Sequence, residues 1–320
     1  MITTNNAFDF MMTLLTKGHQ DETIETFLRH YQEKEWQAQI LVEFVKAIKL
    51  NAKPCPLPRA CLDICGTGGS QKSRFNVSSA SAFILASVGV PVAKHGNYGS
   101  VRSNGSFNFL EALGIIPSSD IKKMQSVFQK TNLAFLLARQ WHPALANLAP
   151  IRKKIGGPTV FNLLGPLCNP ANPETQLIGT TSYTKATLLA ETVALLQESS
   201  AIIVVGADGR DEVSLSGETL WITANKKEVR IESKTFSLFD TDLLWEKNSS
   251  YDGQHNAKLF LSLIQKGDIT HPISQYIALN AGAALCAYQK TDILEGYQLA
   301  LKSIEEKKVE LTLKHYLSLQ

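Results

Sequence analysis

Apolar residues recur at helical spacing through the first part of the chain. The spacing is clear in residues 10–15, 24–28 and 40–48, where each segment gains one apolar face. We therefore expect residues 1–51 to form helices without strands. The proline-rich segment 53–59 then predicts an extended crossing into a second region, because proline lacks the N–H that a continuing helix needs.

From residue 62 onward, short apolar runs alternate with helical patterns. The predicted strands are residues 62–65, 90–94, 133–137, 176–179 and 201–206. The predicted helices between them are residues 78–88, 106–113, 121–130, 144–154 and 184–197. Such alternation is typical of a mostly parallel sheet covered by helices.

The pattern changes again in the last third. Residues 215–232 are short and β-branched, and they predict a hairpin that turns near Asn225, while residues 248–253 read as a loop. Helical spacing returns in residues 257–266, 273–288 and 293–307. The predicted fold class is α/β, with a small all-helical domain and a larger α/β domain built on a mostly parallel central sheet.

Composition narrows the class of protein without identifying it. The 320 residues are 44% hydrophobic and carry a net charge of only +3, which argues against wholesale binding to nucleic acid or membranes. Five irregularly spaced cysteines suggest neither a disulfide framework nor a zinc site. The N-terminus lacks a secretory pattern and no apolar run approaches about 18 residues, so we expect a cytoplasmic protein.

The segment LDICGTGGS, residues 62–70, places a glycine loop directly after a predicted strand. Gly66, Gly68 and Gly69 leave the backbone N–H groups accessible, and glycine tolerates the positive φ of such loops. Asn76, Ser78 and Ser79 then open a helix, whose N-terminus favours anions. This arrangement predicts a phosphate site, although a plain tight turn would have a similar sequence.

Two further segments carry candidate binding groups. KHGNYGS, residues 94–100, puts Lys94, His95 and Asn97 at a strand's carboxyl end, where open α/β sheets bind ligands. WHPALANLAPIRKKIG, residues 141–156, holds His142 at a helix start and Arg152, whose planar guanidinium suits a carboxylate. The alternatives are an ordinary strand-to-helix turn and a basic helix end that complements the helix dipole.

The segment VVGADGRDEVS, residues 204–214, follows a buried strand with Asp208, Asp211 and Glu212. Adjacent carboxylates on such a loop suit Mg²⁺, although a solvated turn has the same composition. Together the four segments predict that a phosphorylated substrate and a small acidic one meet through Mg²⁺.

These segments resemble the successive motifs of the anthranilate phosphoribosyltransferase family. The matching motifs, in order between about residues 52 and 302, are GTGG, FNVSSASAF, KHGN, LEALG, HPA…APIRKKIG, TVFNLLGPLCNPA, QLIG and DGRDEVS. The resemblance implies a helical domain of residues 1–53 with about 158–173, and an α/β domain of residues 54–157 and 174–320. It also implies a homodimer formed through the helical domains.

The resemblance further implies a reaction and a set of binding residues. The phosphoribosyl group of phosphoribosyl diphosphate (PRPP) passes to the amine of anthranilate with Mg²⁺, and diphosphate is released, a step of tryptophan biosynthesis. The implied PRPP residues are Gly66, Gly68, Gly69, Asn76, Ser78, Ser79, Lys94, Asn97 and Ser106. The implied anthranilate residues are Gly66, Asn97, His142, Arg152 and Gly165, and the implied Mg²⁺ ligands are Ser78, Asp211 and Glu212.

The chain departs from the family pattern mainly in the two loops expected around the diphosphate. The departures are Ser70 for an acidic residue, Gln71 for a glycine, Arg74 for a threonine, Tyr98 for an arginine, Val101 and Arg102 for serines, and Pro158 for an arginine. We therefore expect these loops to bind PRPP less tightly, or differently, than the usual enzyme does.

Two other functions remain open at this point. One is a related transferase that acts on a different aromatic acceptor, and the other is a non-catalytic relative that binds a ligand or nucleic acid. His142 and Arg152 favour a carboxylated aromatic acceptor and make a nucleoside phosphorylase a weaker match. The near-neutral charge and the Asp211–Glu212 pair count against a pure binding protein, which has no need of a metal pair.

Overall fold

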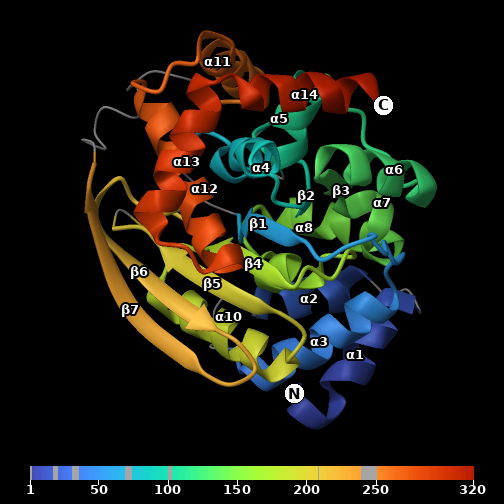
Figure 1. Cartoon of the computed structure of the whole chain (residues 1–320). Coiled ribbons are helices and arrows are strands. Elements are labelled where there is room, and N and C mark those ends of the chain that lie inside the picture. Colours follow the sequence, from blue (N-terminus) through green and yellow to red (C-terminus); the bar gives the residue numbers. More distant parts are fainter. Residues whose placement is uncertain are drawn as a thin grey trace.

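A computed structural model of the chain shows a seven-stranded sheet with a helical lobe beside it (Figure 1). The structure describes residues 2–16, 21–30, 36–68, 74–99, 103–207, 209–238 and 251–320. The lobe begins with α1 (Thr4–Thr16), α2 (Asp21–His30) and α3 (Ala38–Leu50). Buried side chains such as Met11, Leu28 and Phe44 join these helices in one apolar cluster, so the helical N-terminal segment is confirmed.

The sheet has the mostly parallel arrangement that the alternating pattern predicts. Its strands are β1 (Leu62–Gly66), β2 (Val92–Gly96), β3 (Leu133–Leu137), β4 (Thr175–Gly179), β5 (Ser200–Val205), β6 (Ser216–Ala224) and β7 (Val229–Ser237). Strands β1 to β5 pair in parallel, and β6 and β7 add an antiparallel hairpin at one edge. The hairpin turns where Asn225 donates its backbone N–H to the Glu228 carbonyl, as predicted.

The strand order is β3-β2-β1-β4-β5-β6-β7, which places the topological switch between β1 and β4. The chain runs outward from β1 through β2 to β3, and then returns to add β4 and β5 on the other side of β1. At such a switch the connections leave in opposite directions and open a crevice at the carboxyl ends of the strands. The strand order therefore predicts a ligand site at the carboxyl ends of β1 and β4.

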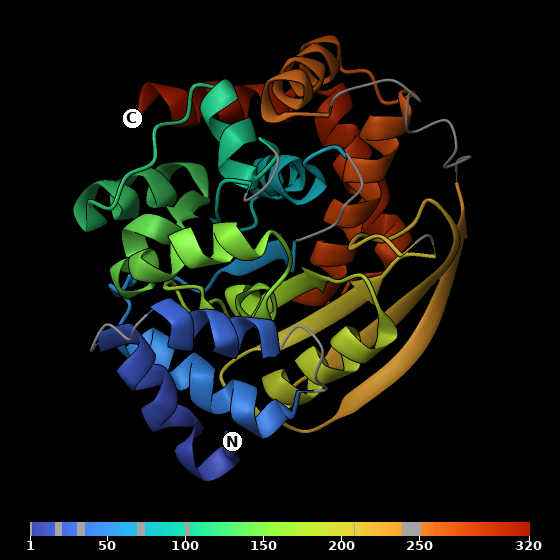
Figure 2. The ribbon, with the colours of Figure 1, turned by 180° about the vertical axis from the view of Figure 1, so that it is seen from behind.

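Helices cover both faces of the sheet because successive strand side chains point to opposite sides. Leu62 and Ile64 of β1 pack into the same core as α4, α12, α13 and α14, whereas Cys65 faces the cluster that contains α3 and α10. The bounds are α4 (Val77–Ser87), α10 (Tyr183–Leu196), α12 (Pro272–Gln289), α13 (Ile293–Glu305) and α14 (Lys308–Ser318). Figure 2 shows the second layer, with α10 and the helical lobe together.

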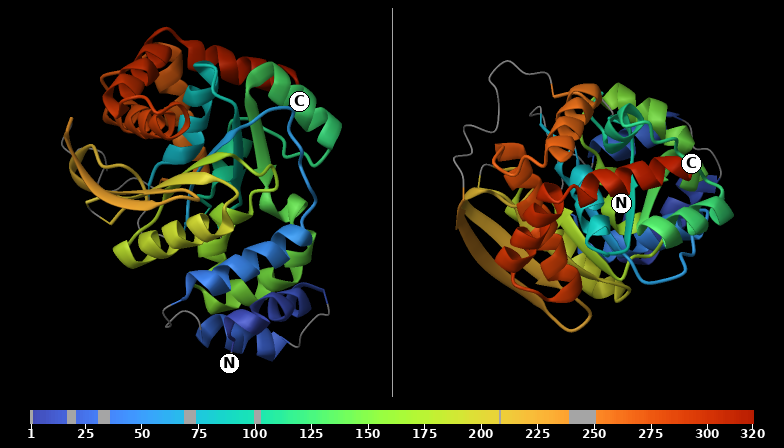
Figure 3. Two further views of the ribbon diagram at one scale, coloured as in Figure 1. Left: turned by 60° about the horizontal axis from the view of Figure 1, so that its bottom comes forward. Right: turned by 45° about the horizontal axis from the view of Figure 1, so that its top comes forward.

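The middle of the chain returns to the helical lobe. The remaining helices are α5 (Ser106–Ala112), α6 (Ile121–Thr131), α7 (Ala138–Trp141), η1 (Pro143–Leu148), α8 (Ala149–Ile155), α9 (Val160–Leu164), η2 (Gly165–Cys168) and α11 (Gly253–Lys266). Leu148, Ile151 and Leu164 share the buried cluster of α1–α3, and Figure 3 shows this green stretch beside the blue lobe. The exact domain boundaries of the sequence analysis stay a prediction.

Two details differ from the predicted elements. The single helix predicted over residues 144–154 is wrong, because the segment divides into η1 and α8 next to Pro150, which has no N–H to donate. Helix α14 was not predicted, although Val309, Leu313 and Tyr316 line its buried face at helical spacing. Within the described ranges, no helix is both long and apolar enough to cross a bilayer.

Candidate active site

The crevice at the strand switch is lined by glycine on both sides. Gly66 ends β1 and Gly179 ends β4, and the two residues are paired in the sheet register. A Cβ on Gly66 would lie 2.5 Å from Asp211 Oδ2, and a Cβ on Gly179 would lie 1.6 Å from the Asp211 carbonyl oxygen. The two strands therefore end in glycine where Asp211 occupies the space, and the glycine turn and the acidic pair meet as predicted.

The acidic pair is buried and held by a helix from the last third of the chain. Asp211 and Glu212 are only 6% and 7% exposed. The Tyr276 hydroxyl on α12 lies 3.3 Å from Glu212 Oε2 and donates to it. One turn further along α12, Asn280 accepts from the Val213 N–H at 2.9 Å and donates back to the Val213 carbonyl at 3.2 Å. The carboxylates are thus positioned by the core rather than left on a mobile turn.

The guanidinium of Arg74 lies on this acidic pair. Its Nη1 forms an ion pair with Asp211 Oδ1 and lies 3.5 Å from Glu212 Oε1. The carboxylate oxygens are the ligand type that Mg²⁺ prefers, so the pair fits that ion chemically. No group of three or more His, Cys, Asp and Glu able to hold a metal occurs in the described part of the chain.

The helix after the glycine loop begins without a side-chain cap. Asn76 precedes α4, but its side chain makes no capping bond, and instead Asn76 Oδ1 accepts from Asn256 Nδ2 at 2.7 Å. Ser78 and Ser79 lie in the first turn, and Gly68 has a φ of +64°, which favours glycine. An uncapped helix start after a glycine loop remains a suitable site for phosphate.

Asparagines join the two loops that border this helix start. Asn256 of α11 is fully buried, and its Nδ2 donates to the Arg74 carbonyl, to Asn76 Oδ1 and to Asn104 Oδ1 at 3.1, 2.7 and 3.1 Å. Asn104 Nδ2 also donates to the Arg74 carbonyl at 2.7 Å. Of the predicted site, Gly69 lies outside the described residues. The departures at Ser70, Gln71, Val101 and Arg102 also lie outside them.

Lys94 is buried below the crevice. It is only 4% exposed, and its Nζ donates to the Ile64 carbonyl at 2.7 Å. Burial lowers the pKa of Lys94, and the nearby Asp63 carboxyl opposes that change. Burial likewise raises the pKa of Asp63 to about 6, against the opposing effects of Lys94 and of the Asn169 amide that donates to it. A phosphate-binding role for Lys94 remains a prediction.

Asn97 and Ser106 meet where β2 gives way to α5. The Ser106 hydroxyl donates to the Asn97 carbonyl at 3.1 Å, and a Cβ on Gly96 would lie 2.1 Å from Ser106 Oγ. Tyr98 follows, and the guanidinium of Arg139 lies 5.1 Å from the centre of its ring. Positive charge is therefore present beside position 98, where the family pattern has an arginine.

Two imidazoles lie together, one from β2 and one from the residue that precedes η1. The rings of His95 and His142 have centroids 5.1 Å apart, and His95 Nδ1 lies 3.3 Å from the Gly165 carbonyl oxygen. Burial lowers the pKa of His95 to about 3 and that of His142 to about 4. Both side chains are therefore neutral at pH 7, and they offer hydrogen bonds rather than charge.

Arg152 stands on α8 against α9. Its guanidinium lies 5.4 Å from the centre of the Phe161 ring, and the next residue, Asn162, donates to the Thr67 carbonyl of the glycine loop at 3.1 Å. Within the described residues no carboxylate forms an ion pair with Arg152. Burial lowers its pKa, but a guanidinium stays charged at pH 7.

Several residues of the site carried no role in the sequence analysis. They are Thr67, Asn162, Gly179, Asn256 and Tyr276. Asn162 had a local signal, because Thr159 and Asn162 form the capping box of α9. Asn256 and Tyr276 had none, since each reaches the site from a helix that only the tertiary fold brings near.

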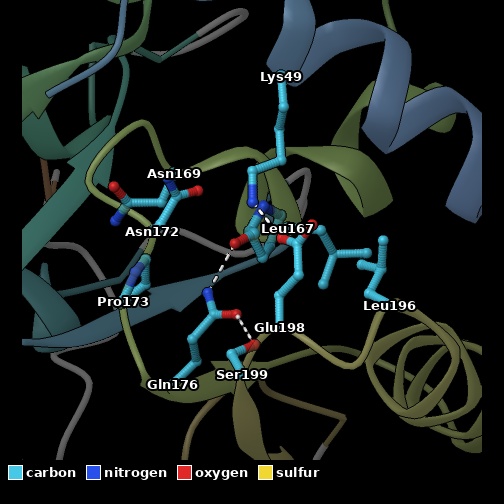
Figure 4. Close-up of a pocket in the computed structure, with 10 residues that line it drawn as sticks. Lys49, Leu167, Asn169, Asn172, Pro173, Gln176, Leu196, Glu198 and Ser199 are labelled. Carbon is cyan, nitrogen blue, oxygen red and sulfur yellow. Dashed lines mark hydrogen bonds and ion pairs between the residues drawn. The ribbon is translucent and has the colours of Figure 1, made fainter. Parts of the chain in front are cut away.

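A small pocket lies away from these residues, at the start of β4 (Figure 4). Its lining includes Lys49, Gln176, Glu198 and Ser199. Lys49 pairs with Glu198, and Gln176 Nε2 donates to the Pro166 carbonyl at 2.7 Å. These polar groups satisfy one another, so the pocket does not call for a ligand.

The sequence matches a known family and its characterised members. A model of the glycosyl transferase family, a/b domain, matches residues 59–308. The chain is 37% identical over 276 residues to the anthranilate phosphoribosyltransferase of Shouchella clausii, covering 85% of this chain and 80% of that one. It is 34% identical over 302 residues to the enzyme of the same name from Streptococcus mutans, covering 93% and 90%.

Solved structures of the same kind resemble the whole fold. Anthranilate phosphoribosyltransferase from Thermus thermophilus superposes with a TM-score of 0.89 at 30% identity, over 99% of this chain and 95% of that one. The Saccharomyces cerevisiae enzyme in complex with PRPP and Mg gives 0.85 at 25% identity, over 99% and 93%. The similarity therefore includes the helical lobe as well as the sheet.

Proposed function

Because this chain belongs to the anthranilate phosphoribosyltransferases of the glycosyl transferase family, we propose that it catalyses their reaction. It transfers the phosphoribosyl group of PRPP to the amine of anthranilate, depends on Mg²⁺ and releases diphosphate. The nitrogen forms a bond to C1 of the ribose as the bond from C1 to the diphosphate oxygen breaks. The electron pair leaves with diphosphate, and the nitrogen loses a proton.

One observation carries this assignment to the crevice: the glycine ends of β1 and β4 and the Asp211 carboxylate occupy one place. This is the topological switch of the sheet, where α/β proteins bind ligands. The uncapped start of α4 supports a diphosphate there through its N–H groups. Gly66, Gly68, Asn76, Ser78, Ser79 and Ser106 are the proposed PRPP residues, with Gly69, Lys94 and Asn97.

The acceptor side is proposed along Asn97, His142, Arg152 and Gly165. The Arg152 guanidinium has no carboxylate partner in the described residues, which supports its use as the clamp for the anthranilate carboxylate. Asn162 ties the adjoining helix to the glycine loop, so the acceptor would be held beside the donor. Holding the two reactants in line supplies much of the acceleration.

No strong base is needed for this reaction, and the two imidazoles beside the proposed acceptor site are weak bases. The aromatic amine is already neutral at pH 7, and His95 and His142 are neutral imidazoles with pKa values of about 3 and 4. Groups this weakly basic orient a nucleophile through hydrogen bonds more readily than they remove a proton from it. The main task of the protein is then alignment.

Asp211 and Glu212 are proposed to hold Mg²⁺, with Ser78. When bound, the ion neutralises charge on the departing diphosphate. In the structure Arg74 compensates one of the two negative charges, and the Tyr276 hydroxyl donates to Glu212. The two carboxylates thus fit a cation, and in the structure the cation beside them is the Arg74 guanidinium.

The assignment is tested by mixing the protein with PRPP, Mg²⁺ and anthranilate and following the loss of anthranilate fluorescence. Turnover that requires all three additions, with diphosphate released in equal amount, is the expected result. Turnover of another aromatic amine but not of anthranilate would move the protein to a related transferase. Absence of turnover with any aromatic amine would contradict the proposal and favour a ligand-binding relative.

A homodimer is also proposed on the resemblance of the sequence, and a cytoplasmic location on the sequence pattern described above. The interface would be formed by α1–α3 of the helical lobe. Analytical ultracentrifugation of the full chain measures the assembly directly, and a monomer at micromolar concentration would contradict it.

A further inference from the structure

Arg74 is built into the acidic pair rather than resting on a surface. The Arg74 side chain is 13% exposed, while those of Asp211 and Glu212 are 6% and 8% exposed. Its backbone carbonyl accepts two bonds, from Asn104 at 2.7 Å and from Asn256 at 3.1 Å. The main chain is therefore fixed at the point from which the guanidinium reaches the carboxylates.

The Arg74 guanidinium occupies the place that a metal ion would take beside the Asp211 and Glu212 carboxylates. Two buried carboxylates side by side repel each other, and a single guanidinium between them compensates one of the two negative charges. The positively charged Nη1 of Arg74 lies against the carboxylate oxygens that a divalent cation would need. Because Mg²⁺ requires oxygen ligands at about 2.1 Å, it cannot bind these oxygens while the guanidinium occupies that space.

We propose that Arg74 is an internal cation that competes with Mg²⁺ for Asp211 and Glu212. The metal binds the pair only when the guanidinium withdraws, so this contact inhibits metal binding in the free protein. The inference rests on the proposed function, which assigns Mg²⁺ to these carboxylates. The fork of the withdrawn guanidinium suits the oxygens of a diphosphate, which is proposed to bind at the adjoining start of α4.

The competition makes the affinity for a metal depend on the residue at position 74. A glutamine keeps much of the length of the arginine side chain but removes the charge, so Arg74→Gln is expected to bind a divalent cation about tenfold more tightly than the parent. Arg74→Lys keeps the charge but loses the planar fork that can reach both carboxylates, so its affinity is expected between the two. A merely structural arginine would not produce this order.

The experiment measures Mn²⁺ binding to the full chain by electron paramagnetic resonance, since Mn²⁺ accepts the same oxygen ligands as Mg²⁺. The set contains the parent, Arg74→Gln, Arg74→Lys and Asp211→Asn. Arg230→Gln is the matched control, because Arg230 is an exposed arginine on β7 that pairs with Glu232. Arg74→Gln is expected to bind Mn²⁺ most tightly and Arg74→Lys next. The parent and Arg230→Gln should bind equally and more weakly, and Asp211→Asn should bind most weakly.

Thermal unfolding with and without Mn²⁺ gives a second readout. Arg74→Gln is expected to be the less stable protein without metal, because its carboxylates lose their counterion, and to gain more from Mn²⁺ than the parent. If Arg74→Gln does not fold, Arg74→Lys decides the question. Tighter Mn²⁺ binding than the parent supports the competition, and equal or weaker binding overturns it.

The anthranilate assay separates this inference from the proposed function. A parent that turns over anthranilate, together with variants at position 74 that bind Mn²⁺ no more tightly, would overturn the competition and leave the reaction standing. A parent without turnover, in a set where no protein binds Mn²⁺, would remove the metal pair and the competition together.

Discussion

The two sides of the crevice treat their charges in opposite ways. On the side proposed for the donor, the Asp211 and Glu212 carboxylates are buried and already share the positive charge of Arg74. On the acceptor side, the Arg152 guanidinium has no carboxylate partner in the described residues, and it lies against an aromatic ring. Under the proposed competition, the acidic pair must release Arg74 before it binds a metal ion. Arg152 has no such partner to release before it binds a substrate carboxylate.

This difference shows where the departures from the family pattern act. Arg74 places a positive charge on the acidic pair. At position 98 the chain has a tyrosine, and the nearby positive charge comes from Arg139, whose guanidinium lies over the Tyr98 ring. The residues proposed for the acceptor, including His142 and Gly165, keep the family pattern. A buried ion pair gains little stability but is costly to break on one side only, so changes to the donor side should have the larger effects.

The largest effect is expected for Asp211→Asn. The variant loses a carboxylate that is proposed to hold Mg²⁺, and with it the positive charge at the departing diphosphate, so kcat should fall by roughly 10²- to 10³-fold. The measurement is the rate of anthranilate consumption at saturating PRPP and Mg²⁺. Asp9→Asn, an exposed change on α1, is the control and should retain the parent rate. A rate within a factor of two of the parent in Asp211→Asn would show that this carboxylate plays no part.

Arg152→Ala tests the acceptor side. If the guanidinium grips a carboxylate equally in the ground and transition states, its loss should raise the KM for anthranilate by about 10- to 100-fold and leave kcat nearly unchanged. Lys153→Ala, the exposed neighbour on the same helix, is the matched control. A fall in kcat with an unchanged KM would mean that the two sides of the crevice do not differ as described.

Gly179→Ala tests the close contact between the end of β4 and Asp211. The added Cβ would overlap the Asp211 carbonyl oxygen at 1.6 Å, so the acidic loop must shift, and the expected loss is about 1–3 kcal/mol of unfolding free energy. Gly165→Ala is the control for stability, because no heavy atom lies within 4 Å of its added Cβ. Urea denaturation of both variants measures the difference, and equal midpoints would argue against the contact.

The pH dependence of stability tests the neutral imidazoles. His95 and His142 have folded pKa values of about 3 and 4, below the ordinary 6.5, so the unfolded chain binds more protons at these groups once the pH falls below about 6.5. Their contribution is complete above that pH and is lost as the pH falls. Each extra proton of the unfolded chain changes stability by about 1.4 kcal/mol per pH unit.

Asp63 acts in the opposite direction between about pH 4 and 6, because its raised folded pKa of about 6 makes the folded chain bind a proton there. Two imidazoles against one carboxyl leave a net loss of stability on acidification. His142→Gln should reduce the slope of the unfolding free energy against pH by up to the contribution of one proton. Urea unfolding between pH 5 and 7 measures this slope. An unchanged slope would show that His142 is not neutral in the folded chain.

Much of the fold could be predicted from the sequence because its signals are local. The strand limits 133–137 match β3, and the β6–β7 hairpin turns at the predicted Asn225. Apolar spacing reports which side of an element is buried, and the parallel direction of the strands follows from their alternation with helices. That Gly66 and Asp211 lie at the same edge of the sheet could also be expected, because they follow parallel strands, although only the strand order β1-β4-β5 brings them together.

The sequence by itself determined the sheet, its glycine ends and the residues that are proposed for the chemistry. Only the tertiary structure decided what those residues touch. Arg74 could have pointed to solvent or to a phosphate, and nothing local indicates that it lies on Asp211 and Glu212. The physical reason is that the partners of a long polar side chain depend on which groups lie within its reach and how deeply they are buried. Both are fixed only when segments remote in the sequence pack together.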